Sequence, residues 1–380
     1  MTDILQKERI EWVDSEARLA ELCDQWSQLD HLAVDTEFIR TDTFYPILGL
    51  LQVSDGEQCW LVDPLAIEDM LPFAELLVDR RVVKIFHACS EDLEVLRHSM
   101  GVVPKPIIDT QVAAAFVGYG FSLGYAALVG DVLDIQLDKH ETRSDWLQRP
   151  LTEAQCRYGA EDVYYLVEVY RRLLAQLQQR LPWVQSDMAE LLTKAGSEGD
   201  NGEYYRRIKG AWQLNAQQLT LLQALAEWRE DMAREQNRPR NRVVSDKQLL
   251  EVARRQPKDM AGLAACGVKH PGSQRRYGDA ILLLVDDIST LDRQYWLKPL
   301  PQPLPREAGV WVKQLRAIQN ELAEELQLAP EILARKADLE AIIASAYKGA
   351  AQLPEHWLGS WREELLAEKM LSALPQLSLS

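Results

Sequence analysis

The chain has 380 residues, of which 47% are hydrophobic and 26% are charged, and its formal net charge is −16. A chain of this length exceeds one ordinary hydrophobic core, so we expect two or three domains. The composition is that of a folded globular protein and argues against a disordered one. No apolar run reaches the length of a membrane span, and the charged N-terminus lacks the pattern of a secretory signal. We therefore expect a cytoplasmic protein.

The five cysteines lie far apart in the sequence and form no C-x-x-C pair. An odd number of widely spaced cysteines is typical of reduced, mostly buried thiols, so we expect neither disulfides nor a zinc site. They are Cys23, Cys59, Cys89, Cys156 and Cys266.

Patterns of strands and helices alternate over the first 180 residues. The segments "HLAVDTEF" (31–38), "LGLLQVSD" (48–55) and "QCWLVDP" (58–64) follow one another across short turn-like breaks, which predicts an antiparallel meander. The apolar run "VVKIFHA" (82–88) leads into a helical pattern, and "PIIDTQVAAAFVG" (106–118) does the same. Strands followed by strand–helix units indicate a mixed sheet with helices on its faces.

Beyond the small, polar stretch "KAGSEGDNGE" (194–203), strand patterns almost disappear and helical patterns dominate. Two of these helical regions look like copies of one another at an offset of about 90 residues, and the proline-rich "PQPLP" separates them. We predict the following boundaries: an α/β domain over 1–195, a linker over 196–209, a helical domain over 210–292, a linker over 293–304 and a second helical domain over 305–380.

The net charge conceals a basic segment. Between Tyr204 and Gly278, 15 Lys or Arg stand against 7 Asp or Glu, so the rest of the chain carries −24. A basic module in an acidic protein is typical of a nucleic-acid clamp, and a solvated helical face is the alternative.

Two carboxylates interrupt the first strand pattern. Asp35 and Glu37 are two residues apart, so strand alternation places both on one face. Buried like charges side by side are unfavourable unless a cation lies between them.

Two further acids lie in comparable settings. Asp92 falls early in the helix that follows the run 82–88, and Asp162 lies on a later helix with Tyr158 on the same face. Taken singly, each would be a helix cap or a dipole partner. Four carboxylates from separate elements, however, suit two Mg²⁺ or Mn²⁺ ions that act on a phosphoryl group.

The order of these motifs resembles that of the DEDD 3′→5′ exonucleases: a D-x-E on the first strand, an Asp after a later strand and a Y-x-x-x-D on a late helix. Within the tyrosine subgroup, "FHACSEDLEVL" and "ETRSDWLQRPLTEAQCRYGAEDVYYL" are similar to the ribonuclease D family. The two helical copies resemble its paired HRDC domains. The resemblance implies an α/β ribonuclease H-like exonuclease domain, with a mixed five-stranded sheet and flanking helices, followed by two small all-α HRDC-like domains.

The same resemblance implies roles for the five motif residues. Asp35, Glu37, Asp92 and Asp162 would bind two divalent metal ions, Mg²⁺ or Mn²⁺, and Tyr158 would orient or deprotonate the attacking water. The implied activity is 3′→5′ trimming of transfer RNA precursors and other small structured RNAs, with release of nucleoside 5′-monophosphates. We expect a monomer.

Five other residues are candidates for RNA contact. Gln52 would face the 3′-terminal nucleotide and His87 a phosphate or sugar, although each also fits a structural role. Arg238, Arg240 and Arg242 of the loop "NRPRNR" would bind phosphates, with a solvated helix connection as the alternative.

Asp109 and Trp146 are expected to have structural roles. Asp109 fits a helix N-cap better than a fifth metal ligand, and Trp146 fits a core position.

Two other functions remain open from the residues alone. A DNA exonuclease of the proofreading or repair type would use the same acids, because none of them reads a 2′-hydroxyl. A non-catalytic RNA-binding scaffold would have no need of all five motif residues. The chain contains no G-x-x-x-x-G-K-[ST], which argues against a helicase.

Overall fold

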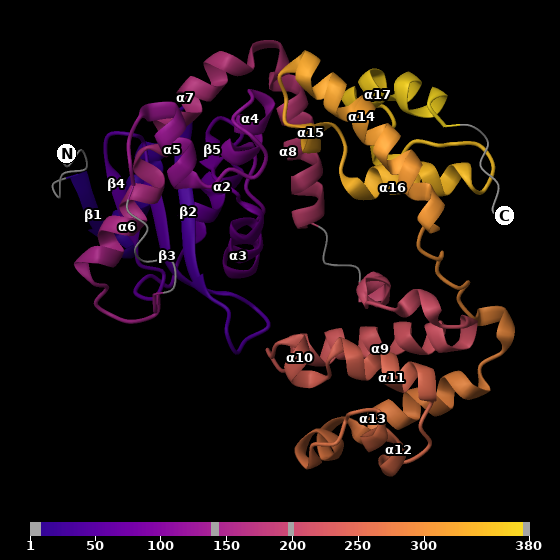
Figure 1. The fold of residues 1–380 in the computed structure, drawn as a ribbon. Helices are drawn as coiled ribbons and strands as arrows, with labels where there is room; N and C mark the ends of the chain where they lie inside the picture. Colours follow the sequence, from indigo (N-terminus) through magenta and orange to yellow (C-terminus); the bar gives the residue numbers. More distant parts are fainter. Residues whose placement is uncertain (1–8, 138–143, 197–200, 375–380) are drawn as a thin grey trace. The chain divides into compact units, whose positions relative to one another are not determined.

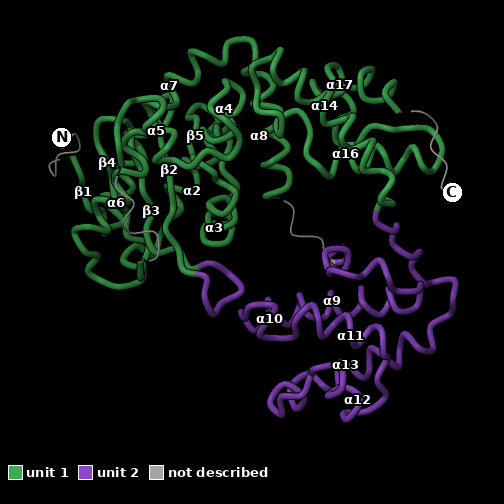
Figure 2. Tube along the Cα trace, viewed as in Figure 1, with its two compact units in different colours: residues 1–39, 47–196, 304–380 green, residues 40–46, 197–303 purple. Residues whose placement is uncertain are grey.

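The computed structural model describes residues 9–137, 144–196 and 201–374. Two compact units make up the chain (Figure 2). Unit 1 comprises residues 1–39, 47–196 and 304–380, and unit 2 comprises residues 40–46 and 197–303. Within the described ranges, no helix has the length and apolarity needed to cross a membrane. All five cysteine thiols are free.

One mixed sheet forms the centre of unit 1 (Figure 1), with the strand order β1-β4-β3-β2-β5-β6. Strands β2, β3 and β4 are antiparallel neighbours, which confirms the predicted meander. The pairs β1–β4, β2–β5 and β5–β6 are parallel. The strands are β1 (Ile10–Val13), β2 (His31–Ile39), β3 (Ile47–Ser54), β4 (Cys59–Val62), β5 (Val83–Phe86) and β6 (Ile107–Asp109).

The prediction of five strands was wrong by one, because β1 was not foreseen. This strand is four residues long, and Glu11 interrupts its apolar pattern. The Glu11 carboxylate accepts hydrogen bonds from Arg18 Nε at 2.7 Å and from Trp60 Nε1 at 3.1 Å. Arg18 neutralises the Glu11 charge and Trp60 adds a hydrogen bond, so this carboxylate is tolerated in a strand where the sequence pattern makes it look unfavourable.

Helices cover both faces of the sheet (Figure 1). On one face, Trp26 of α1 packs edge-on against Trp60 of β4 and Phe73 of α2, with ring centroids 5.2 and 6.1 Å apart. On the other face, the Cys59 thiol donates to the carbonyl of Ala160 in α6 at 3.5 Å. The first eight helices are α1 (Glu16–Trp26), α2 (Leu71–Val78), α3 (Ser90–Met100), α4 (Thr110–Phe116), α5 (Tyr125–Leu133), α6 (Glu153–Tyr164), α7 (Leu166–Leu177) and α8 (Leu181–Gly196).

The C-terminal helices belong to the same compact unit as the sheet. Arg362 donates two hydrogen bonds to the carboxylate of Asp187 in α8, at 2.7 and 2.6 Å. The rings of Trp183 and Trp361 stack with centroids 5.0 Å apart. The predicted second helical domain therefore packs directly on the sheet domain. Its helices are α14 (Gly309–Leu326), α15 (Pro330–Leu333), α16 (Lys336–Ala346) and α17 (Trp361–Ser372).

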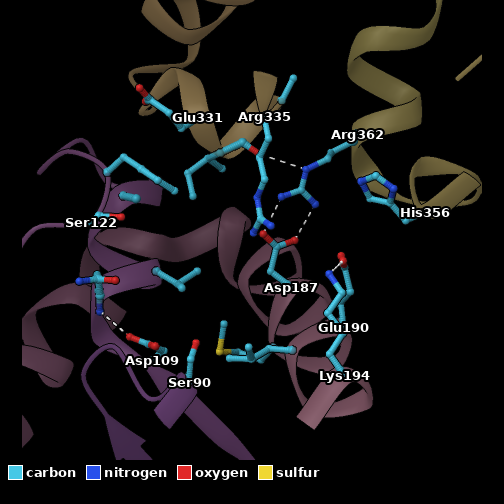
Figure 3. A pocket seen from close by; sticks show the side chains of 18 of the residues that line it. Ser90, Asp109, Ser122, Asp187, Glu190, Lys194, Glu331, Arg335, His356 and Arg362 are labelled. Carbon is cyan, nitrogen blue, oxygen red and sulfur yellow. Dashed lines mark hydrogen bonds and ion pairs between the residues drawn. The ribbon is translucent and has the colours of Figure 1, made fainter. Parts of the chain in front are cut away.

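A cavity of about 590 Å³ lies between α8, α16 and the start of α3 (Figure 3). Its polar lining includes Asp187, Arg335, His356 and Arg362. Most of these groups already have partners: Arg362 holds Asp187, and His356 Nε2 lies 3.3 Å from Asp338. None of the four predicted metal-binding acids lines this cavity.

Unit 2 is helical apart from its connecting loops. Helices α10 and α15 each have four residues, and α10 and α11 begin 90 residues before α15 and α16. Leu249 and Leu339, which the repeat aligns, are both buried. The helices of unit 2 are α9 (Ala216–Glu235), α10 (Arg240–Val243), α11 (Asp246–Arg255), α12 (Met260–Ala265) and α13 (Pro271–Thr290).

The predicted linker over 196–209 needs correction. Residues 197–200 lie outside the described part of the chain, but Tyr205 and Ile208 are buried in the core of unit 2. The polar composition around residue 200 suggested a longer linker. Because Tyr205 and Ile208 belong to the core of unit 2, the helical domain begins before residue 210.

We predict that Gly49→Ala destabilises unit 1. A Cβ at this position would lie 2.6 Å from the carbonyl oxygen of Trp146. Relieving this clash requires a shift of the backbone, which is energetically unfavourable. The free energy of unfolding, measured with urea, should fall by about 1–3 kcal/mol. The control is Gly309→Ala, because no atom lies within 4 Å of a Cβ at this exposed position in α14. Equal stability of the two variants would contradict the packing argument.

Candidate active site

Strand β2 presents the D-x-E pair to the face that α6 covers. Asp35 lies opposite Gln52 of β3, and Gln52 lies opposite Leu61 of β4, so the three share one face. Cys59, two residues before Leu61, also points to this face and contacts α6. Glu37, two residues after Asp35, follows the same alternation. The strand pairing shifts by one residue directly after Glu37, where a bulge interrupts the ladder before it resumes at Phe38.

A network at the start of α3 positions Asp92. Ala88 has φ +58°, a left-handed conformation that turns the chain into the helix. The Asp109 carboxylate accepts from the amides of Ala88 and Cys89 at 2.9 and 3.0 Å. The Thr36 hydroxyl donates to the carboxylate of Asp92, which is only 7% exposed. The turn and the Thr36 hydrogen bond thus fix this acid beside β2.

Asp109 also accepts from the amide of Gln111 at 2.8 Å, so its predicted role as the N-cap of α4 is confirmed. The predicted core position of Trp146 is confirmed as well, because its side chain is buried.

Helix α6 supplies the remaining two side chains. It begins with a capping box, in which the Thr152 side chain accepts from the amide of Gln155 and the Gln155 side chain accepts from the amide of Thr152. Tyr158 and Asp162 lie one turn apart on the same side of the helix. The Tyr158 hydroxyl forms a hydrogen bond with the Asp162 carboxylate. The five motif residues therefore come together in unit 1, from β2, α3 and α6.

The four carboxylates interact strongly with one another. Burial and the neighbouring Asp92, Asp162 and Glu37 raise the pKa of Asp35 well above its usual range. Burial, with Asp162 and Asp92, raises the pKa of Glu37 to about 8. Burial also raises the pKa of Asp92 to about 6 and that of Asp162 to about 7. Gathered in one partly buried site, these carboxylates repel one another when all are charged, and a counter-cation would offset that repulsion.

This donor set fits divalent metal ions. Four carboxylates provide the hard oxygen ligands that Mg²⁺ and Mn²⁺ prefer, and the charges of the other three raise the pKa of Asp35. Over the described ranges, however, no three acidic, histidine or cysteine side chains are placed so that they could already coordinate one metal ion. Their mutual repulsion keeps the carboxylates apart when no cation is present. We expect them to move closer together around a bound cation.

Tyr158 remains a protonated hydroxyl at neutral pH. Burial raises its pKa above the usual range for tyrosine, and the carboxylates of Asp162, Glu37 and Asp35 raise it further. A protonated hydroxyl in this setting is able to donate a hydrogen bond.

The structure argues against direct RNA contact by two of the predicted residues. Gln52 is 0% exposed, so its side chain cannot reach a nucleotide. His87 Nδ1 lies 2.9 Å from the Thr110 hydroxyl and Nε2 lies 3.1 Å from the Leu123 carbonyl, so both ring nitrogens have partners. Polarity near the D-x-E strand suggested RNA contact, but Gln52 is fully buried and the ring nitrogens of His87 bond to groups of the protein itself.

The three candidate arginines lie in unit 2 and differ in their surroundings. Arg240 binds the carboxylate of Glu230, which is 0% exposed, and its guanidinium also lies 4.7 Å from the centre of the Phe44 ring. Its charge is neutralised inside the module, which does not support the predicted phosphate contact. The exposed Arg242 lies 3.4 Å from Asp42, and Arg238 is half-buried. Arg238 and Arg242 thus remain candidates for phosphate binding.

Two residues near the acids were not predicted. Thr36 lies between Asp35 and Glu37, and its hydroxyl holds Asp92 of α3, a contact between segments 56 residues apart that no local motif marks. Tyr125 of α5 donates its hydroxyl to the Glu161 carbonyl at 2.9 Å, and the Asp162 charge contributes to raising its pKa. No local motif marks Tyr125, because its proximity depends on the packing of α5 against α6.

Known protein families match both parts of the chain. Residues 10–178 match the 3′-5′ exonuclease family, and residues 218–285 match the HRDC domain family. These matches and the arrangement of acids define a DEDD-type exonuclease, a class that depends on divalent metal ions, joined to an HRDC module.

Full-length relatives narrow this class. The chain is 48% identical to ribonuclease D of Pseudomonas paraeruginosa, over 96% of this chain and 97% of the relative. It is 37% identical to ribonuclease D of Escherichia coli, over 96% and 98% of the two chains. The crystal structure of the E. coli enzyme superposes with a TM-score of 0.89 and covers 97% of this chain and 100% of that one, at 35% identity. The chain belongs to the ribonuclease D family of 3′→5′ exoribonucleases.

We predict that, in EDTA, the protein loses stability as pH rises from about 5 to about 8. Ordinary pKa values for these acids are 3.8 for Asp and 4.5 for Glu, and burial raises those of Asp92, Asp162 and Glu37 to about 6, 7 and 8. The folded state therefore binds more protons than the unfolded state in this window. Each such proton lowers the free energy of unfolding by about 1.4 kcal/mol per pH unit.

Urea unfolding at pH 5, 6, 7 and 8 measures this slope. Asp35→Asn should flatten it by removing one of the repelling carboxylates, and Mg²⁺ should raise the wild-type stability most above pH 7. A pH slope that is the same in the wild type and the variant would contradict the coupling.

Proposed function

We propose that the protein trims the 3′ ends of transfer RNA precursors and other small structured RNAs, releasing nucleoside 5′-monophosphates by two-metal-ion hydrolysis. The single observation that carries this proposal is the convergence of four mutually repelling carboxylates from β2, α3 and α6 beside a protonated tyrosine. A scaffold gains nothing from such an unfavourable cluster. A hydrolase needs it in order to hold cations at a phosphodiester.

Asp35, Glu37, Asp92 and Asp162 would hold two divalent ions, which when bound supply Lewis-acid stabilisation of the attacking and leaving oxygens. The protein's own part is positional. The Thr36 hydroxyl and the pinned start of α3 fix Asp92, so one ligand is held in place before substrate arrives.

Tyr158 completes the arrangement as an orienting group. Its hydroxyl bonds Asp162 and stays protonated, so it can donate a hydrogen bond to the attacking water or to the phosphate. Of the two roles that sequence left open, we propose positioning of the water and not its deprotonation.

The choice of RNA as substrate rests on the relatives. The E. coli enzyme is described as an exoribonuclease involved in structured RNA processing. Phosphate contacts by Arg238 and Arg242 would suit either nucleic acid, because such contacts do not separate RNA from DNA. A DNA exonuclease of the repair type would use the same acids.

A time course on transfer RNA with an unpaired 3′ extension and a 5′ label tests the proposal. We expect a ladder that shortens from the 3′ end with Mg²⁺ or Mn²⁺, is absent in EDTA and is weak on a matched DNA strand. Degradation of DNA alone would move the assignment to repair or proofreading. No product from either strand would contradict a nuclease function.

We predict that Asp35→Asn lowers turnover by roughly 10³-fold or more, because residues that hold one catalytic assembly fail together. Binding of RNA should remain within about threefold of the wild type, since the phosphate contacts proposed for unit 2 are unchanged. Single-turnover kinetics and fluorescence anisotropy measure the two quantities. A turnover near that of the wild type would exclude Asp35 as a metal ligand.

We predict that the double variant Arg238→Ala/Arg242→Ala weakens RNA binding and lowers the slope of log K against log salt by about 1–2. The matched comparison is Arg240→Ala, which should destabilise unit 2 by about 3–5 kcal/mol because it removes a partner of buried Glu230. Anisotropy titrations between 50 and 200 mM salt decide the first point. An unchanged salt slope in the double variant would remove these arginines from the RNA interface.

A further inference from the structure

Gln52 is the most unusual buried polar side chain near the acids. It is 0% exposed, and neither Oε1 nor Nε2 has a hydrogen-bond partner. In the part of the chain that the structure describes, no other buried side chain leaves both a donor and an acceptor unpaired. An unpaired carboxamide in a core is unfavourable, and an apolar side chain of similar shape would fill the same space better.

The surroundings of Gln52 point to one partner. The β2–β3 ladder places Gln52 directly opposite Asp35, on the same face, and side chains paired in this way have Cβ atoms about 4.5–5.5 Å apart. From above, α6 approaches so closely that a Cβ at Gly159 would lie 3.3 Å from Gln52 Nε2. Gly159 stands between Tyr158 and Asp162 in the sequence. The carboxamide therefore lies at the base of the acid cluster, beneath the backbone of the helix that carries Tyr158 and Asp162.

We propose that Gln52 is a positioning residue of this site, whose Nε2–H donates to the carboxylate of Asp35 when that carboxylate holds metal. The proposal rests on the metal-binding function proposed above. Metal-binding carboxylates are themselves hydrogen-bonded, and such outer partners fix the orientation of the ligand. Full burial excludes contact of Gln52 with the nucleotide, so its effect passes through Asp35.

The test is Gln52→Met, which keeps an unbranched side chain of similar volume beneath Gly159 but removes the donor. Thermal unfolding in EDTA should show a midpoint equal to or above that of the wild type, because the variant no longer buries an unpaired amide. Calorimetric titration with Mn²⁺ should show an affinity about 10–100-fold weaker. The KM for RNA should stay within about twofold while kcat falls at subsaturating metal.

A second buried glutamine provides the matched control. Gln319 of α14 donates to the carbonyls of Pro330 and Ala334, at 2.5 and 2.6 Å. Gln319→Met should lower the unfolding midpoint, because the buried carbonyl of Ala334 and the partly buried carbonyl of Pro330 lose their donor, and leave Mn²⁺ affinity unchanged. Gln52→Leu, which also lacks a donor, repeats the measurement should the methionine variant not fold.

The outcomes separate the two proposals. Weaker Mn²⁺ binding by the Gln52 variant, without loss of stability, supports the positioning role. Wild-type Mn²⁺ affinity in that variant, with affinity lost in Asp35→Asn, would overturn the role of Gln52 and leave the metal site intact. Equal Mn²⁺ affinity of the wild type and Asp35→Asn would instead show that the metal site itself is misassigned.

Discussion

Repulsion among four partly or fully buried carboxylates is the constraint on which the site depends. Three local arrangements position the four acids: strand alternation for Asp35 and Glu37, a left-handed turn and a threonine hydroxyl for Asp92, and a capped helix for Asp162. Holding these like charges together therefore lowers the free energy of unfolding. A divalent cation relieves this repulsion, and so binding of metal and stability of the fold are coupled.

Several polar side chains around this cluster form hydrogen bonds with other groups of the protein. Asp109 binds amides at the start of α3, and His87 bonds Thr110 and Leu123. Tyr125 donates to the backbone of α6. These bonds leave little freedom in the elements that carry the acids. Gln52 departs from this pattern because its carboxamide has no hydrogen-bond partner. For this reason we assign it the Asp35 carboxylate as a partner in the metal-bound site.

Much of this site could be predicted from the sequence because its signals are local. Asp35 and Glu37 are out of place in an apolar strand, and Tyr158 and Asp162 have helical spacing. Thr36, Tyr125 and the burial of Gln52 depend on strand register and on the packing of α5 and α6, which no short motif encodes. The same distinction holds for the fold: the antiparallel meander has clear turns between its strands, whereas β1 becomes a strand only through its pairing with β4. Arg240 looked like a phosphate ligand until Glu230, ten residues away, was seen to bind it.

The central claim is that the four acids form a site for two metal ions. Electron paramagnetic resonance of Mn²⁺ titrated into the protein tests it most directly, because two ions about 3.5–4 Å apart are magnetically coupled. We expect two Mn²⁺ per chain and a coupled signal that appears as the second equivalent binds, with both lost in a variant lacking Asp35 and Asp162. A single uncoupled ion at saturation would contradict the two-metal account.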